Sequence, residues 1–185
     1  YWALNLRDPQ TLEAVSSGIN DETAPKWSII TYHFPKLGKR KAVKVTWYDG
    51  GKKPDPALAS QKELPGNGSI LIGSKDTLYI PMYWGKGTFL SGATVADHKD
   101  VPETIEKPAD FNRHHYLEWI EACKGGKPAW SNFDYAGPMT EAMLLGLVAL
   151  RSGKKIEWDA KKMRVKNVPD ANRFIHSEYR KGWVL

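Results

Sequence analysis

The stretch from Asp134 to Leu150 constrains the fold of this chain more than any other. From Met139 onward its apolar residues cover nearly the whole circumference of a helix. A helix that is apolar all round must be buried, because a surface helix keeps a polar stripe. The run is shorter than the roughly 20 apolar residues of a membrane span, and Pro138 and Glu141 interrupt it. We therefore predict the central helix of a hydrophobic core.

Both ends of this helix carry sequence signals. Asp134 suits an N-terminal cap and Pro138 suits a first turn, so the start is predicted near these residues. Arg151 in the last turn and Gly153 just beyond it predict the end. Gly146, inside the helix, costs about 1 kcal/mol relative to Ala. We therefore expect another backbone to pack closely against it.

Residues 1–82 are strand-rich. Period-2 alternation is weak over residues 11–19 and clear over 42–51, while residues 27–35 are rich in β-branched and aromatic side chains. The charged segment KLGKRK between the last two strands reads as a hairpin loop. Val43, Val45 and Trp47 share one face of the returning strand, which is typical of an antiparallel sheet with one covered face.

The rest of the chain divides into three parts. Residues 52–67 read as an exposed loop rich in Pro and Lys, and Ile70–Ile72 and Leu78–Ile80 form the clearest hairpin. Residues 83–110 read as irregular. Residues 111–185 are helical, with a first helix ending at Gly125, a short strand anchored by Trp158, and a short terminal helix. Strands first and helices after predict a single α+β domain, with an open, mostly antiparallel sheet and helices on one face.

Charge, cysteine content and the first residues limit the possible class of protein further. The chain has 185 residues and a formal net charge of +6, with basic residues spread over loops, which usually indicates a solvated surface. The only cysteine, Cys123, excludes an internal disulfide, and its helical position indicates a buried, inert thiol. The opening YWALNLRDPQ lacks Met and is apolar at once, which indicates a fragment or a processed product. Neither a signal peptide nor a membrane segment is seen.

The ordered segments HYLEWIEACKGGKPAW, FDYAGPMTEAMLLGLVALRSGKKIEWD and ANRFIHSEYRKGWVL resemble the C-terminal domain of Gfo/Idh/MocA-type oxidoreductases, in a bacterial-type subgroup. LNLRDP, ETAPKWSIITYHFP and VTWYDGGKKP extend the resemblance over almost the whole chain. It implies a domain that shapes the pocket for a sugar, sugar derivative or cyclitol and makes oligomer contacts through its open sheet. The N-terminal Rossmann domain of such enzymes, which binds NAD or NADP, would be missing.

The glycine pattern is consistent with a missing Rossmann domain. A dinucleotide site needs a Gly-rich turn between a strand and a helix. No G-x-G-x-x-G occurs here, and the pairs Gly66/Gly68 and Gly85/Gly87 read as loop glycines. We therefore expect no cofactor site in this chain, and NAD or NADP only in the intact protein.

Two short motifs match the residue types of the family's catalytic motifs, but not their positions along the chain. Members use a Lys in an E-K-P tripeptide and often a His in a D-x-x-x-H pattern much further along. Here Glu106-Lys107-Pro108 and Asp110 with His114 lie side by side, just before a helix well inside the C-terminal domain. We therefore assign no catalytic residue to this chain, and no ligand set for a metal emerges.

Asn112, His114 and His115 are the substrate-binding candidates. They cluster at a helix start, where polar side chains and the helix dipole can meet sugar hydroxyls or a carboxylate. The alternative is that His115 packs and His114 is solvated.

The eight tryptophans leave a second function open. Four of them (Trp27, Trp47, Trp84 and Trp130) can form a sugar-stacking platform, or each can bury about 150–250 Å² in a core or interface. We favour the interface.

The leading hypothesis is thus the substrate and oligomerisation domain of an NAD(P)-dependent oxidoreductase, inactive alone. Its expected partners are its missing Rossmann domain, a sugar-like molecule and a second copy in a homodimer or homotetramer, with no nucleic acid and no membrane. A cytoplasmic location is slightly favoured over a periplasmic one. The alternative is a free-standing carbohydrate-binding module.

Overall fold

A computed structural model of the chain describes residues 1–81, 87–98, 100–102, 104 and 111–183, except the side chains of Val95, Phe111 and Asn112. The fold is α+β, as predicted, with two antiparallel sheets. The chain divides into two compact units, residues 1–52 with 116–185 and residues 53–115.

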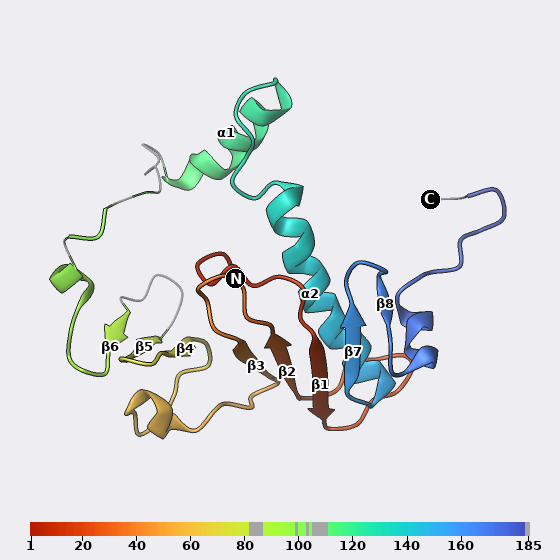
Figure 1. Cartoon of the computed structure of the whole chain (residues 1–185), viewed down its shortest axis with the longest axis horizontal. Coiled ribbons are helices and arrows are strands. Elements are labelled where there is room, and N and C mark those ends of the chain that lie inside the picture. The colour runs from red at the N-terminus through yellow and green to blue at the C-terminus, as the bar shows by residue number, and fades with distance from the viewer. Residues whose placement is uncertain (82–86, 99, 103, 105–110, 184–185) are drawn as a thin grey trace. The chain divides into compact units, whose positions relative to one another are not determined.

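The first unit is built on a five-stranded sheet in the order β3-β2-β1-β7-β8 (Figure 1), and its neighbouring strands all pair antiparallel. The strands are β1 (Thr11–Ser16), β2 (Ser28–Phe34), β3 (Val43–Asp49), β7 (Ile156–Asp159) and β8 (Arg164–Val165). The three strands predicted in the first 51 residues are therefore confirmed. The loop between β2 and β3 closes through mutual backbone hydrogen bonds of 3.0 Å between Leu37 and Arg40.

Helix α2 (Phe133–Ser152) packs on one face of this sheet. Side chains that alternate along β1 and β2, among them Leu12, Ile30 and Tyr32, meet the buried side of the helix. Trp158 of β7 lies in the same core, and its indole N–H donates to Glu141 Oε1 of α2 at 3.0 Å. The predicted short strand anchored by Trp158 is thus confirmed.

The start of α2 differs from the prediction. The cap is Asn132, whose Oδ1 accepts from the backbone N–H groups of Asp134 at 3.0 Å and Tyr135 at 3.3 Å. The helix thus begins at Phe133, and Pro138 lies in its second turn, where it supplies no N–H to Asp134 O. The end is as predicted, because Gly153 adopts φ +62 beyond Ser152.

Gly146 has a different neighbour from the expected one. A Cβ at this position would lie 2.1 Å from Tyr32 Oη and 3.2 Å from Ile30 Cγ2. The close neighbour is therefore the side chain of Tyr32, rather than a backbone. The tyrosine hydroxyl occupies the space that a side chain at position 146 would need.

The prediction that α2 is buried all round is wrong for one face. Ala142, Leu145 and Ala149 are buried, but Met143, Leu144 and Leu147 are 59%, 55% and 49% exposed. The reason is that the sheet covers only one side of the helix.

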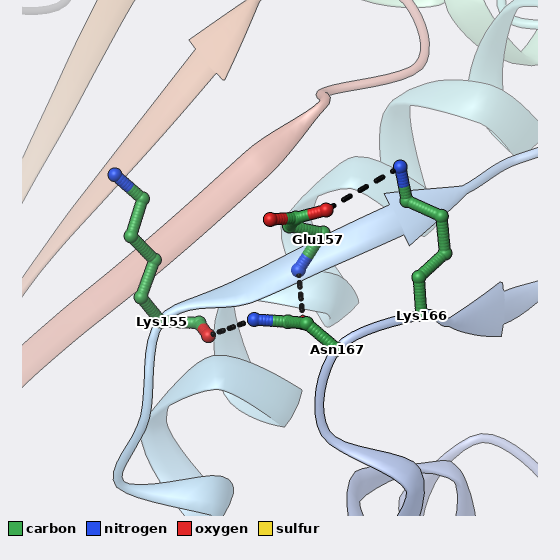
Figure 2. Close-up of polar contacts among 4 residues, drawn as sticks. All are labelled: Lys155, Glu157, Lys166 and Asn167. Atoms are coloured by element: carbon green, nitrogen blue, oxygen red, sulfur yellow. Dashed lines mark hydrogen bonds and ion pairs between the residues drawn. The ribbon is translucent and has the colours of Figure 1, made fainter.

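The side-chain amide of Asn167 links the segment after β8 to the start of β7. Asn167 Nδ2 donates to Lys155 O at 2.9 Å, and Asn167 Oδ1 accepts from Glu157 N at 2.7 Å (Figure 2). The Lys166 ammonium lies 3.5 Å from Glu157 Oε2. Beyond β8 the predicted terminal helix is a 3₁₀ turn, η3 (Pro169–Phe174), which begins earlier than expected because Pro169 suits a first helical position.

The second unit holds a three-stranded antiparallel sheet, β4 (Ser69–Ile72), β5 (Thr77–Ile80) and β6 (Thr88–Phe89). The predicted hairpin is confirmed, with Leu71 opposite Leu78. The segment read as an exposed loop contains a 3₁₀ turn, η1 (Pro56–Ala59), and buries Ala59 and Leu64. A further turn, η2 (Val95–His98), lies in the region read as irregular.

Helix α1 (Phe111–Cys123) spans the boundary between the units. Its apolar side, with Tyr116, Trp119 and Ile120, is exposed. Cys123 is exposed as well, so the prediction of a buried thiol is wrong. The helical pattern placed Cys123 beside Ile120 correctly, but that side of the helix is not packed.

Candidate functional site

The predicted substrate residues lie in the first turns of α1. His114 is half-buried and His115 is exposed, the reverse of the packing alternative considered above. Asn112 belongs to the helix, but its side chain lies outside the described residues. The helix therefore brings the two histidines to its first part, and their role in substrate binding stays a prediction.

The exposed face of the five-stranded sheet has a graded composition that follows from its register. At one end Lys44 lies opposite His33, and Thr11 lies opposite both His33 and Glu157. At the other end lie three larger side chains, Val15, Ile29 and Tyr48, which are also cross-strand partners. The face is thus polar and charged at one end and mostly apolar at the other.

A hollow of about 640 Å³ opens at the charged end of the sheet. Its cationic or titratable lining consists of His33, Lys36 and Lys44, and none of the described carboxylates lines it. His33 Nε2 lies 3.8 Å from Glu13 Oε1. Sequence reasoning missed this site because it treated the lysines as part of a solvated loop.

A second hollow, of about 290 Å³, lies beside the start of α2. Arg7 lines it and donates from Nη2 to Asp134 O at 2.8 Å. Tyr1 lines it as well, and its ring lies edge-on to that of Tyr135, with 6.1 Å between the ring centroids. Burial raises the pKa of Tyr1 to about 12, despite the opposing effect of the Arg7 guanidinium. Aromatic and planar polar groups together are able to contact a sugar ring.

Three of the four tryptophans considered for a sugar-stacking platform lie in the described residues, and each has a different neighbour. Trp27 lies just before β2, with the Lys52 ammonium 4.5 Å from its ring centroid, whereas Trp47 lies opposite Ile30 on the helix side of the sheet. Trp84 lies outside the described residues. The Trp130 ring lies edge-on to that of Trp2, with 5.8 Å between the ring centroids. Sequence analysis did not single out Trp2 as a partner.

In the second unit the carboxylate of Asp76 accepts hydrogen bonds from two segments of the chain. The Ser91 hydroxyl donates to Asp76 Oδ2, and this bond, with backbone N–H donors, lowers the pKa of Asp76. Asp76 also caps Thr77 N at 2.7 Å. The carboxylate therefore ties the β4–β5 turn to the loop that follows β6.

The remaining motifs add no site. Gly66 and Gly68 precede β4, so no helix follows them, and Gly85 and the Glu106-Lys107-Pro108 and Asp110 matches lie outside the described residues. Among the described side chains no group of three His, Cys, Asp or Glu is placed to hold a metal ion. No helix in the described part of the chain is long and apolar enough to cross a membrane.

Comparison with known proteins leaves the family open. No protein-family model matches the chain, and no curated protein matches it significantly.

Proposed function

We propose that this chain is the substrate-binding and oligomerisation domain of a Gfo/Idh/MocA-type, NAD(P)-dependent oxidoreductase acting on a sugar, sugar derivative or cyclitol. The observation that carries the proposal is the outward face of α2. Met143, Leu144 and Leu147 are about half exposed on a helix whose opposite face is fully packed. An exposed apolar stripe on a long helix is typical of a surface that another domain covers.

The occupant proposed for this stripe is the nucleotide-binding domain of the same protein. The fold supports this choice because an α+β layer with one packed sheet face leaves the outer helix face for a second layer. The nicotinamide of the bound dinucleotide would supply hydride transfer. The described residues contain no strand–glycine turn–helix unit that fits a dinucleotide, so its binding is assigned to the other domain and no step is derived through it.

The substrate contribution of this domain is assigned to the start of α1. Asn112, His114 and His115 offer amide and imidazole groups that can position hydroxyls. They act as positioning groups, because the proton-transfer residues of the family's motifs are expected in the other domain.

Oligomerisation is assigned to the exposed sheet face. Val15, Ile29 and Tyr48 form an apolar row at one end of it, and an isologous contact would place two such rows together. We expect a dimer in sedimentation analysis. A Val15→Lys variant should dissociate it, whereas Trp47→Lys, on the other face of the sheet, should leave it intact.

The enzymatic part is tested on the purified chain with NAD, NADP and a panel of polyols. The proposal expects neither dinucleotide binding by calorimetry nor turnover. A preparation that reduces either dinucleotide with any polyol contradicts the assignment of the cofactor to another domain.

The alternative, a free-standing carbohydrate-binding module, is favoured by one observation. Trp2 and Trp130 are both about half exposed and meet edge-on near the hollow beside Arg7. A glycan screen separates the two functions. Binding by a monomer that is lost in Trp130→Ala and kept in Trp183→Ala supports the module, and a parent chain that binds no glycan contradicts it.

A further inference from the structure

The positive charge of this chain is concentrated in one hairpin. Residues 36–44 hold five basic residues and no acidic one, whereas the whole chain has 27 basic and 21 acidic residues, a net of +6. Basic and acidic residues therefore nearly balance outside this hairpin. The structure holds the hairpin in one shape through the paired hydrogen bonds of Leu37 and Arg40 and through Gly38, at φ +56.

The hairpin's cations border the larger hollow. Lys36 and Lys44 line it together with His33, and His33 and Lys44 are direct cross-strand partners. An imidazole N–H and an ammonium group on paired residues are both able to donate hydrogen bonds to an anion placed between them. Within the described residues neither Lys36 nor Lys44 forms an ion pair, whereas His33 Nε2 lies 3.8 Å from Glu13 Oε1.

The available donors favour one kind of anion. The Arg40 guanidinium, the group suited to a planar carboxylate, is committed to Lys41 O and Pro35 O, both at 2.8 Å. What remains at the hollow are ammonium groups, which act as compact point charges with three donors each. Such groups suit a tetrahedral oxyanion with several negative charges better than they suit a planar one.

We propose that the hollow lined by His33, Lys36 and Lys44 binds the phosphate or sulfate group of a small-molecule ester. The apolar lining, Phe34, Pro35 and Val43, lies against the organic part of the ligand. This site goes beyond the proposed function and does not depend on it.

The test titrates the isotopically labelled chain with inorganic phosphate and inorganic sulfate, at an ionic strength held constant with chloride. Backbone amide shifts in NMR spectra report the position and the affinity. The proposal expects saturable shifts confined to residues 33–44. In a Lys36→Gln/Lys44→Gln variant the affinity should fall about tenfold, because two ammonium groups face each oxyanion.

A matched control is Lys161→Gln/Lys162→Gln, which removes two exposed lysines from the β7–β8 turn of the same unit. Both pairs are exposed, so all variants should unfold at the same temperature as the parent. Preference for one anion identifies the ester class, and equal binding supports the shared chemistry. Shifts that do not saturate, that spread over the chain's lysines, or that weaken equally in both variants overturn the site. Failure of the dinucleotide or dimer experiments leaves this result unaffected.

Discussion

Arg7 Nη2 donates to the backbone carbonyl of Asp134 at 2.8 Å, and this is the oxygen that Pro138 leaves without its usual helical donor. An α-helix interior pairs each carbonyl with the N–H four residues on. Proline has no N–H, so a residue distant in sequence supplies the hydrogen bond. This contact ties the segment before β1 to the start of α2.

The first prediction concerns this contact. Arg7→Ala should lower the free energy of unfolding by about 1 kcal/mol, because a charge-assisted hydrogen bond to a partly exposed carbonyl is lost. Urea denaturation measures the change. Lys161→Ala, on an exposed turn, is the control and should have little effect.

A double-mutant cycle isolates the cause. In a Pro138→Ala background the backbone gains an N–H at position 138 that can donate to Asp134 O, so removing Arg7 should cost less than half as much as in the parent. An unchanged cost in both backgrounds would show that Arg7 acts through some other contact.

The second prediction is that Gly146→Ala destabilises the chain by about 1–3 kcal/mol, although Ala is normally the better helix former. The new Cβ would meet Tyr32 Oη at 2.1 Å. Thermal unfolding measures the loss. Adding Tyr32→Phe should recover part of it, since the closest atom is removed while Tyr32 Cζ, at 2.9 Å, stays.

The third prediction concerns the joint between α2 and β7. Glu141→Ala leaves the buried Trp158 indole N–H without its acceptor, and we expect a loss of about 1–2 kcal/mol. Glu141→Gln keeps an acceptor and should lose much less. Equal losses in the two variants would mean that the charge, rather than the hydrogen bond, stabilises the joint.

The fourth prediction is a loss of stability in alkali. Burial raises the pKa of Tyr32 in the folded chain, so the folded state holds this proton at pH values where the unfolded chain has lost it. The stabilisation is complete below about pH 10, the pKa of an unperturbed tyrosine, and is lost as the pH rises through the folded value. Melting temperatures measured between pH 8 and 11 should fall less steeply for Tyr32→Phe than for the parent.

Local patterns predicted much of the fold. The alternation of Leu12 and Val15, the hairpin around Leu71 and the anchoring of Trp158 all follow from side-chain period and turn chemistry. The exact start of α2 could not be predicted from local patterns. Arg7 donates a hydrogen bond to Asp134 O, and this allows Pro138 to lie in the second turn instead of the first. The neighbour of Gly146 was also beyond local rules, since it comes from β2.

The candidate sites were less predictable. Apolar periodicity in both helices indicated burial, but Leu147 and Cys123 are exposed, because periodicity does not say whether a covering element is present. The hollow at Lys36 and Lys44 depends on the pairing of β2 with β3 and on the fastening of Arg40. Neither relation has a local signal in the sequence.

The nucleotide sequence upstream of the codon for Tyr1 decides between the two proposed functions. If the chain is the second domain of an NAD(P)-dependent oxidoreductase, the reading frame continues upstream and encodes a strand, a G-x-G-x-x-G turn and a helix, followed by an E-K-P segment. A reading frame that opens immediately before Tyr1 would overturn the oxidoreductase proposal and make the carbohydrate-binding module the better explanation.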